Sequence, residues 1–329
     1  MIIDAQHHIM PPEFAEFYLK HSLAAPKCPK VTKDGKDYTF DFGPYTYYYP
    51  HAKFSAEASF EMMEQNGIDL VLISGQIPDA TLLPGELSVE GTRIMNNCLQ
   101  ESIERWPGRY KGVGFLPWNL PEQAIAEAQR LKKMGFVGVQ LLSHVSYGPA
   151  DLKTYEQIYE ELARLGLVVF IHPMIPEWGE YISSYSMIPM MGFMIVESFT
   201  LMRLILSGIV ERNPNLKIVM PHCGGVLPAL SGRIWNQTVN MKRGIDNITK
   251  MPVDVLKSEQ IYYDLVSPDP ESMKFIAKYL GGTEKLMFST DWPWVNPPSI
   301  LIEHAKEAFP DPADQERIFS GTAKAFLGL

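Results

Sequence analysis

The sequence is poor in cysteine and has no excess of positive charge. Its 329 residues include three cysteines, Cys28, Cys98 and Cys223, which lie far apart in the chain. A disulfide framework or a thiolate zinc site needs paired or closely spaced cysteines, so we expect reduced thiols. The 29 Lys and Arg residues are outnumbered by 38 Asp and Glu residues, which leaves a formal net charge of −9. This balance argues against a nucleic acid partner, because proteins that bind phosphate backbones carry basic surfaces.

Long hydrophobic runs are also missing. The longest segment without Asp, Glu, Lys or Arg extends from Met134 to Ala150, and it is too short and too rich in glycine to span a bilayer. The first residues contain no basic segment followed by an apolar run, which a secretory signal would need. With 46% hydrophobic and 20% charged residues, the composition is that of a folded globular protein. We therefore expect a cytoplasmic protein with no membrane partner.

Eight short apolar runs alternate with longer segments that have helical periodicity. Because the runs are continuously apolar, they are typical of strands buried on both faces of a parallel sheet. This alternation favours an α/β fold, a (β/α)8 TIM barrel, formed as a single domain over residues 1–329; a doubly wound sheet is the alternative. The runs begin near Ile2, Asp69, Gly112, Gly138, Leu167, Leu216, Gln260 and Lys285.

Residues with known positional preferences mark several expected helix ends. Ser55 can cap a helix that stops at Gly67, where glycine tolerates the left-handed exit. Pro121 fits the first turn of another helix. Thr154 with Gln157 resembles a capping box at the start of a third. These signals support the alternation of strands and helices.

One segment, about residues 26–54, interrupts the alternation after the first strand. Its Asp34-Gly35 pair lies between segments of β-branched and aromatic residues, which predicts a small β-hairpin. Active sites of barrels lie at the C-terminal ends of the strands, so the tyrosines that follow could cover a substrate. Packing on the barrel rim or on a partner subunit is the alternative interpretation. The tyrosines are Tyr45, Tyr47, Tyr48 and Tyr49.

Ionisable residues stand at the C-terminal ends of three predicted strands. His8 ends the first strand, His172 the fifth and Asp291 the eighth. Because these ends meet at one face of a barrel, the side chains are predicted to converge. Two imidazoles and one carboxylate can hold a divalent metal and leave a position open for water or substrate. Each residue alone could be a hydrogen-bonded structural group, but their shared location favours a metal site.

Three further residues are candidates at the same face. Gln6 is two positions from His8 and shares its side of the strand, whereas His7 points the other way. His222, at the end of the sixth strand, could be a further ligand or a base that acts on metal-bound water. His144, at the end of the fourth strand, is a candidate for contact with substrate.

Several motifs resemble those of the amidohydrolase superfamily. Within it, they are most similar to the amidohydrolase-related branch typified by aminocarboxymuconate semialdehyde decarboxylase, and the resemblance covers nearly the whole chain. The motifs are Asp4-x-Gln6-x-His8, His172-Pro173, His222-Cys223-Gly224-Gly225, Met287 to Pro293, Leu204 to Ile218, Gly232-Arg233-Ile234 and Gly321 to Phe326.

The resemblance implies a barrel with one divalent metal ion, with zinc favoured and manganese the alternative. It implies His8, His172 and Asp291 as ligands, and His222 as the residue that positions or deprotonates a metal-bound water. Arg233 matches an arginine that reaches into the neighbouring subunit to hold substrate carboxylate, which implies a homodimer. The planar guanidinium suits this task because it can bind a carboxylate through two hydrogen bonds. A surface ion pair is the other interpretation of Arg233.

The sequence departs from the family at Gln6, where the family has His or, in some decarboxylases, Glu. An amide offers only its carbonyl oxygen, which is a poorer donor than imidazole or carboxylate. We therefore expect a metal held less tightly or by fewer protein groups, with Gln6 beside the substrate. His7 cannot replace Gln6 without a change of register.

The leading hypothesis is a metal-dependent, non-oxidative decarboxylase, a carbon-carbon lyase that acts on a small aromatic or unsaturated carboxylic acid. In this reaction His222 and Asp291 would manage the proton that reaches the carbon. The alternatives are a lactone or amide hydrolase, a hydratase, or a barrel that binds ligands without catalysis. No Gly-x-Gly-x-x-Gly turn follows the first strand, so a dinucleotide cofactor is not expected.

Overall fold

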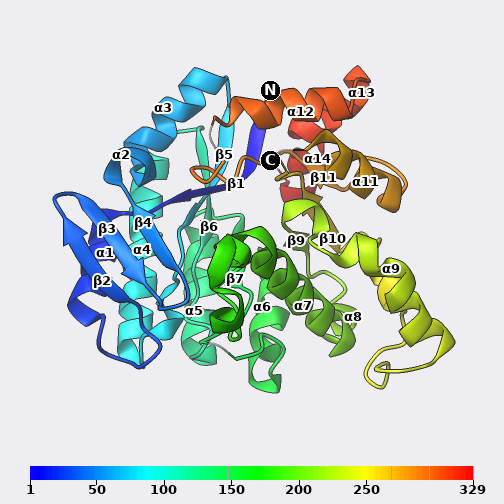
Figure 1. Cartoon of the computed structure of the whole chain (residues 1–329), viewed down its shortest axis with the longest axis horizontal. Helices are drawn as coiled ribbons and strands as arrows, with labels where there is room; N and C mark the ends of the chain where they lie inside the picture. The colour runs from blue at the N-terminus through cyan, green and yellow to red at the C-terminus, as the bar shows by residue number, and fades with distance from the viewer. Residues whose placement is uncertain (147, 268, 296, 329) are drawn as a thin grey trace.

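Eight parallel strands form one continuous sheet in the computed structural model, which describes residues 1–146, 148–267, 269–295 and 297–328. The order of the strands in the sheet is their order in the chain, β1-β5-β6-β7-β8-β9-β10-β11. This topology confirms the predicted (β/α)8 barrel (Figure 1). The strands are β1 (Ile3–Ile9), β5 (Leu70–Gly75), β6 (Tyr110–Gly114), β7 (Gly138–Leu142), β8 (Val168–His172), β9 (Ile218–Met220), β10 (Ile261–Asp264) and β11 (Leu286–Met287).

Backbone hydrogen bonds connect the first strand to the last and close the barrel. Ala5 N donates to Phe288 O at 3.0 Å, and His8 N donates to Trp292 O at 3.0 Å. Between them, Asp291 N donates to Gln6 O at 2.9 Å. The closure therefore places Asp291 directly beside the end of β1.

Helices connect the strands and pack around the sheet (Figure 1). They are α1 (Pro12–His21), α2 (His51–Phe54), α3 (Ala56–Asn66), α4 (Glu86–Arg105), α5 (Pro121–Lys133), α6 (Glu156–Leu165), α7 (Phe193–Leu206), α8 (Ile209–Arg212), α9 (Leu227–Trp235), α10 (Pro252–Val255), α11 (Pro270–Leu280), α12 (Ser299–Ala308), α13 (Pro312–Glu316) and α14 (Thr322–Leu327). Shorter helical turns are η1 (Ala80–Leu82), η2 (Lys153–Tyr155), η3 (Gly179–Ile182), η4 (Ser184–Ser186), η5 (Ile188–Gly192), η6 (His222–Gly224), η7 (Asn236–Asn240) and η8 (Arg317–Gly321).

Two of the three expected capping signals lie where the sequence indicates. The Ser55 hydroxyl accepts from Ala58 N at the start of α3, and Gly67 ends that helix in the left-handed region with φ +64°. Pro121 is the first residue of α5. The capping box at Thr154 is wrong, because the turn η2 precedes α6 and no side chain caps that helix. Here Gln157 donates to the Thr154 carbonyl instead.

The apolar side chains form two layers, one inside the barrel and one between strands and helices. Strands β1, β5, β7 and β8 are buried along their whole length, as continuous apolarity predicts. A smaller cluster that includes Ala5, Leu72 and Phe170 fills the interior, and Phe326 of α14 packs against it. This packing leaves the C-terminal ends of the strands as the place for polar residues.

The insertion is larger than the predicted hairpin. Strands β2 (Lys30–Asp34) and β3 (Asp37–Asp41) form the expected hairpin around Gly35, and β4 (Thr46–Tyr49) adds a third antiparallel strand. Along the chain, helix α1 lies between β1 and this small sheet. Along β4, exposed and buried residues alternate, so that Tyr47 and Tyr49 face inward. The sheet lies against one side of the barrel in Figure 1.

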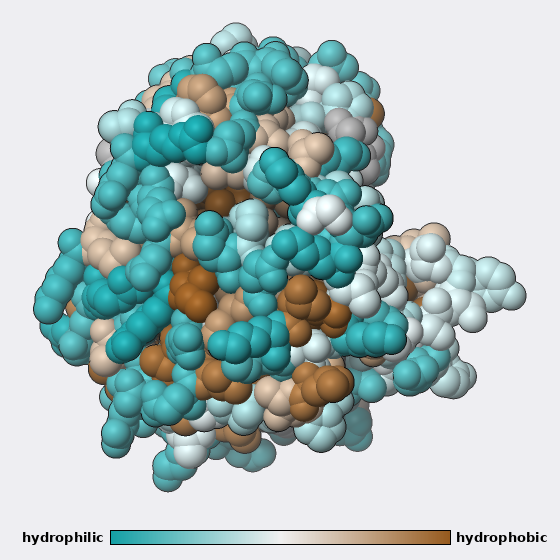
Figure 2. All heavy atoms as spheres, turned by 90° about the vertical axis from the view of Figure 1, so that its left-hand side faces the viewer, coloured by the Kyte–Doolittle hydropathy of each residue, from teal (hydrophilic) through white to brown (hydrophobic). Residues whose placement is uncertain are grey.

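One helical segment of the described chain, Ser184–Leu206, is long and apolar enough to cross a membrane, which by itself is weak evidence. In this fold, 44% of the most apolar 18-residue stretch of this segment is buried. The segment contains α7, whose Glu197 is fully buried and forms an ion pair with His222 at the barrel end. These contacts are those of a core helix of a barrel. The side of the molecule that carries the insertion is mostly hydrophilic, with small separate hydrophobic areas (Figure 2).

Candidate active site

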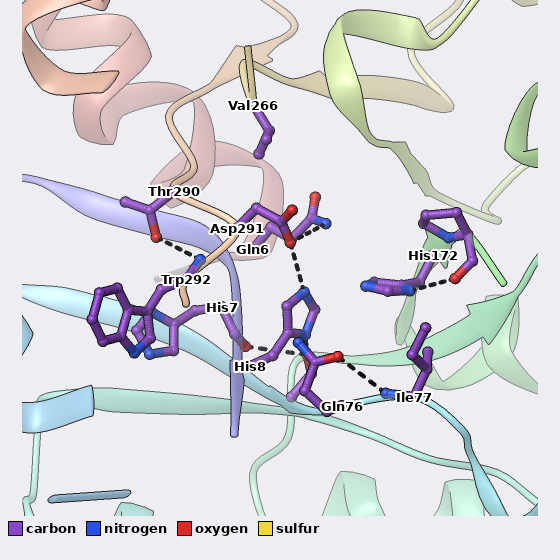
Figure 3. A network of polar contacts seen from close by, with 12 residues as sticks. Gln6, His7, His8, Gln76, Ile77, His172, Val266, Thr290, Asp291 and Trp292 are labelled. Carbon is purple, nitrogen blue, oxygen red and sulfur yellow. Dashed lines mark hydrogen bonds and ion pairs between the residues drawn. The ribbon is translucent and has the colours of Figure 1, made fainter. Parts of the chain in front are cut away.

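His8, His172 and Asp291 converge at the C-terminal end of the barrel. Each offers a ligand atom, and these atoms all lie within 4.8 Å of one another. His8 Nε2 is 3.2 Å from Asp291 Oδ1, and the two imidazole rings meet edge to face with centroids 4.6 Å apart (Figure 3). Two strand ends and the loop that follows β11, all distant in the sequence, thus supply one compact cluster of nitrogen and oxygen donors.

Hydrogen bonds at the outer nitrogens aim both imidazoles into the cluster. His172 Nδ1 donates to Pro173 O at 2.8 Å, which leaves the lone pair on Nε2. His8 Nδ1 lies 2.7 Å from Ser74 Oγ, and that hydroxyl donates its own proton to His7 O. Because Ser74 can then only accept from His8, Nδ1 carries the proton and Nε2 is again the free donor atom.

The charge states of these residues suit a cation. Burial and the neighbouring His8 lower the pKa of His172 to about 3, so its ring is neutral near pH 7. Burial alone would raise the pKa of the Asp291 carboxyl, but His222 and His8 outweigh it and hold that pKa well below its usual range. His8 Nε2 is buried and has no hydrogen-bond partner in the described part of the chain. The neutral imidazole of His172, the carboxylate of Asp291 and the unsatisfied ring nitrogen of His8 therefore fit a divalent metal ion.

Gln6 and His7 point to opposite sides of β1, as the alternation of a strand requires. Gln6 Nε2 donates to Asp291 Oδ1 at 3.2 Å, so the amide lies at the edge of the metal cluster. His7 faces outward, where its ring nitrogens contact Asp4 Oδ2 at 3.1 Å and Ser59 Oγ at 2.7 Å. His7 is therefore a structural residue of the layer between strand and helix.

His222 lies next to the cluster and is held from three directions. It stands in η6 with a left-handed backbone, φ +53°, which is a strained conformation for a residue with a side chain. Its backbone N donates to Asp264 Oδ1 at 2.8 Å. Its Nδ1 lies 2.9 Å from Glu197 Oε2, and its Nε2 lies 3.7 Å from Asp291 Oδ2. The imidazole is thus placed between two carboxylates.

This placement favours the protonated form of His222. Burial alone would lower the pKa of the imidazole, but Glu197 and Asp291 outweigh it and raise that pKa well above the usual value. Burial also raises the pKa of Glu197, and it raises the pKa of Asp264 to about 7. A histidine that holds a proton beside a metal cluster can act as a general acid.

Sequence reasoning missed Glu197 and Asp264. Glu197 comes from α7, far in the sequence from the strand ends where ligands were sought. The sequence does mark Glu197, because it is the one carboxylate in the long apolar segment from Tyr181 to Met202. Asp264 is the last residue of β10, the same position that marked the other candidates.

A cavity of about 550 Å³ opens above the cluster. His172, His222 and Asp291 form its polar end, and aromatic and aliphatic side chains form most of its walls. The walls include Tyr45 and Tyr47 of the insertion, Phe193 of α7 and Trp294. The insertion therefore covers the cavity with two of its tyrosines. The described lining residues include no Lys or Arg.

The other two tyrosines of the insertion lie elsewhere. The Tyr49 hydroxyl donates to Ile77 O at 2.5 Å within the core, and Tyr48 is exposed with its hydroxyl on Asp37.

Two predicted substrate contacts lie outside the cavity of their own chain. His144 is buried, its Nε2 donates to Ile175 O at 3.0 Å, and it is not among the described lining residues. Arg233 is exposed on α9, on the outside of the barrel. The structure thus gives His144 a structural contact, and the role of Arg233 depends on a second subunit.

The whole chain matches one protein family. The family described as Amidohydrolase matches residues 3–329, so the chain belongs to the amidohydrolase family and the resemblance seen in the sequence is confirmed. The 2-amino-3-carboxymuconate-6-semialdehyde decarboxylase of Dictyostelium discoideum is 28% identical over 72% of this chain and 66% of that relative, just under two thirds of its length. The gamma-resorcylate decarboxylase of Rhodococcus jostii is 27% identical over 77% of this chain and 80% of that relative.

Solved structures share the same fold. The 5-carboxyvanillate decarboxylase of Novosphingobium aromaticivorans, solved with bound manganese, has a TM-score of 0.84 with 19% identity and covers 100% of this chain and 97% of its own. The named relatives are decarboxylases, which are carboxy-lyases, as the leading hypothesis expects.

Proposed function

We propose that this protein is a metal-dependent, non-oxidative decarboxylase of small aromatic carboxylic acids. The observation that carries the proposal is the contact between two functional units: a three-residue metal cluster, and a histidine held between two carboxylates, at the base of one aromatic-walled cavity. Decarboxylation needs both, because negative charge must be stabilised while a proton reaches the carbon that loses carbon dioxide.

The residues of the chain divide this task. His8, His172 and Asp291 would hold the metal, which would supply a positive centre for the oxygens of the substrate, and Gln6 Nε2 donates to Asp291 Oδ1 at the edge of this set. His222 presents Nε2 toward the same space and donates the proton. Asp291 would keep the imidazolium beside the residues that would hold the metal.

The shape and lining of the cavity support an aromatic substrate. Its volume of about 550 Å³ has room for a single substituted ring. Tyr45 packs edge to face against Phe193, and Tyr47 against Trp294, with centroids 6.3 Å and 5.9 Å apart. Such aromatic walls favour flat apolar rings by contact area and by edge-to-face packing. They also exclude water from the site where the proton is transferred.

We propose manganese as the metal rather than the zinc that the sequence favoured. The donor set of two imidazole nitrogens and one carboxylate oxygen contains no sulfur, and a carboxylate oxygen is a ligand that suits manganese. The manganese-bound decarboxylase of the same fold supports this assignment.

We also propose a homodimer that places Arg233 at the site of the partner subunit. Leu230 lies one turn before Arg233 on the same side of α9 and is exposed, and Trp235 and Phe275, which line one groove between α9 and α11, are exposed as well. Exposed apolar side chains around an arginine are typical of an interface between subunits. In the described part of the chain, Arg233 forms no ion pair with a side chain of its own subunit.

Carbon dioxide release from protein loaded with manganese tests the function. A panel of hydroxybenzoates, with His172→Ala as the metal-site control, should give release with the wild type and loss of metal and activity with the variant. Opening of a lactone or amide substrate without carbon dioxide release would overturn the proposal in favour of a hydrolase.

A further inference from the structure

Glu197 is a buried carboxylate whose burial is explained by its contact with His222. Its side chain is completely buried on α7, and its Oε2 lies 2.9 Å from His222 Nδ1. Its second oxygen, Oε1, is also buried and has no hydrogen-bond partner among the residues that the structure describes. A carboxylate that served only to stabilise the fold would be expected to satisfy both oxygens, because leaving one buried and unpaired costs free energy. The contact with His222 is therefore the one interaction for which this charge is buried.

The backbone beside His222 leaves room for that carboxylate. Gly225 follows η6 with φ +57°, a conformation that favours glycine. A Cβ atom at this position would lie 2.5 Å from Ser198 Oγ and 3.0 Å from Glu197 Oε1. The absence of a side chain at residue 225 thus allows α7 to approach and to place Glu197 against the imidazole.

The orientation of the ring follows from these contacts. With Nδ1 paired to Glu197 and the His222 backbone N bound to Asp264 Oδ1, the ring cannot turn over without losing a buried hydrogen bond. The remaining nitrogen, Nε2, then faces Asp291 and the cavity. A ring free to flip would present Nε2 toward the substrate for only part of the time.

We propose that Glu197 is a positioning residue that accepts the Nδ1 proton of His222 in a hydrogen bond and so assigns Nε2 as the atom that exchanges a proton with the substrate. This inference rests on the proposed decarboxylation. In the reaction, the Nε2 proton forms the new C–H bond at the ring carbon, and the bond from that carbon to the carboxylate then breaks. Its electron pair restores the aromatic ring and carbon dioxide leaves. His222 remains as the neutral tautomer with the proton on Nδ1, held by Glu197, and solvent returns a proton to Nε2.

Two substitutions at the same position separate orientation from stability. Glu197→Gln keeps an acceptor of the same shape, and Glu197→Leu keeps the volume but removes the acceptor. Glu127→Gln is the matched control, because Glu127 is also a buried helix carboxylate, paired with Arg130 and Asn96 away from the cavity. All four proteins are compared after loading with manganese, by metal content, melting temperature, binding of a nitro analogue of the substrate, KM and kcat.

The expected order of kcat is wild type, then Glu197→Gln, then Glu197→Leu, with a loss of about a hundredfold or more in the leucine variant. Metal content, KM and analogue binding should stay close to wild type, and Glu127→Gln should match the wild type in kcat. A leucine variant with wild-type kcat would overturn the proposal. So would a loss of kcat that is matched by loss of metal and analogue binding, because that pattern indicates a structural role.

Nitrogen-15 NMR of histidine-labelled protein gives a readout that does not require turnover. At a pH at which His222 is neutral, its signal, assigned with a His222→Gln variant, should show the single tautomer with the proton on Nδ1 in the wild type and a mixture of tautomers in Glu197→Leu. An identical pattern in both proteins would refute the positioning role. If the wild type released no carbon dioxide from any acid while the NMR patterns differed, the proposed reaction would fail and the positioning of His222 would stand.

Discussion

Asp291 divides its two carboxylate oxygens between two histidines with different tasks. Oδ1 lies 3.2 Å from His8 Nε2, and Oδ2 lies 3.7 Å from His222 Nε2. The first histidine belongs to the metal cluster, and the second is the proton donor of the proposed reaction. One side chain therefore fixes the distance between the metal cluster and the group that would deliver the proton.

Substitution of these two residues should separate metal binding from proton transfer. His222→Asn should keep the metal and lose about a thousandfold in kcat, because it removes the acid without removing a ligand. Asp291→Asn should lose both metal and activity. Elemental analysis beside turnover checks this, and either variant with wild-type kcat would exclude the role assigned to its residue. Asp291→Asn should change the melting temperature little, whereas His222→Asn should lower it, because Glu197 would then be a buried carboxylate without its partner.

Gln6 should limit the affinity for metal. Gln6→Glu and Gln6→His place a stronger donor at the same position of β1, so each should lower the metal dissociation constant by about tenfold or more. The neighbouring His7→Gln serves as a control that faces the other side of the strand. Chelator competition followed by metal titration measures the constants. Equal or weaker affinity in both Gln6 variants would show that Gln6 does not face the metal.

The pH dependence of turnover should distinguish an acid from a base at His222. The pKa of this imidazole is raised above 6.5 by Glu197 and Asp291, so the protonated form is present below the raised pKa and is lost as pH rises through it. We therefore expect kcat to be level across neutral pH and to fall on the alkaline side. His172 adds no step near neutrality, because its pKa is about 3. A rate that instead climbs with pH to a plateau would indicate that His222 acts as a base, as in the hydrolase alternative.

The insertion should contribute to substrate binding through the tyrosines that line the cavity. Tyr45→Ala removes part of an aromatic wall and should raise KM about tenfold with a smaller change in kcat. Tyr48→Ala is the matched control, since Tyr48 belongs to the same sheet but is exposed. If both variants behaved alike, the insertion would act as rim packing rather than as a cover for substrate.

The sequence predicted the parts of the site that topology alone determines. His8 and His172 lie at the ends of parallel strands and Asp291 follows the end of β11 by a few residues, and any closed barrel of this order brings such positions to one face. Glu197 could not be placed this way, because its meeting with His222 depends on how closely α7 packs and on the missing side chain at Gly225. The third strand of the insertion was overlooked although Tyr47 and Tyr49 alternate with exposed residues. The false capping box at Thr154 shows a local motif overridden by a helical turn that precedes the helix.

The proposed dimer predicts that two inactive variants restore each other. If Arg233 serves the site of the partner subunit, a mixed dimer of His222→Asn and Arg233→Ala chains has one site with both residues intact. Random mixing makes about half of the dimers mixed, so about a quarter of wild-type activity should return on refolding the two chains together. Arg243→Ala in place of Arg233→Ala is a control for loss of charge near the same surface. If Arg233 acts within its own chain, every site in the mixture lacks one residue, and the mixture stays as inactive as its parents.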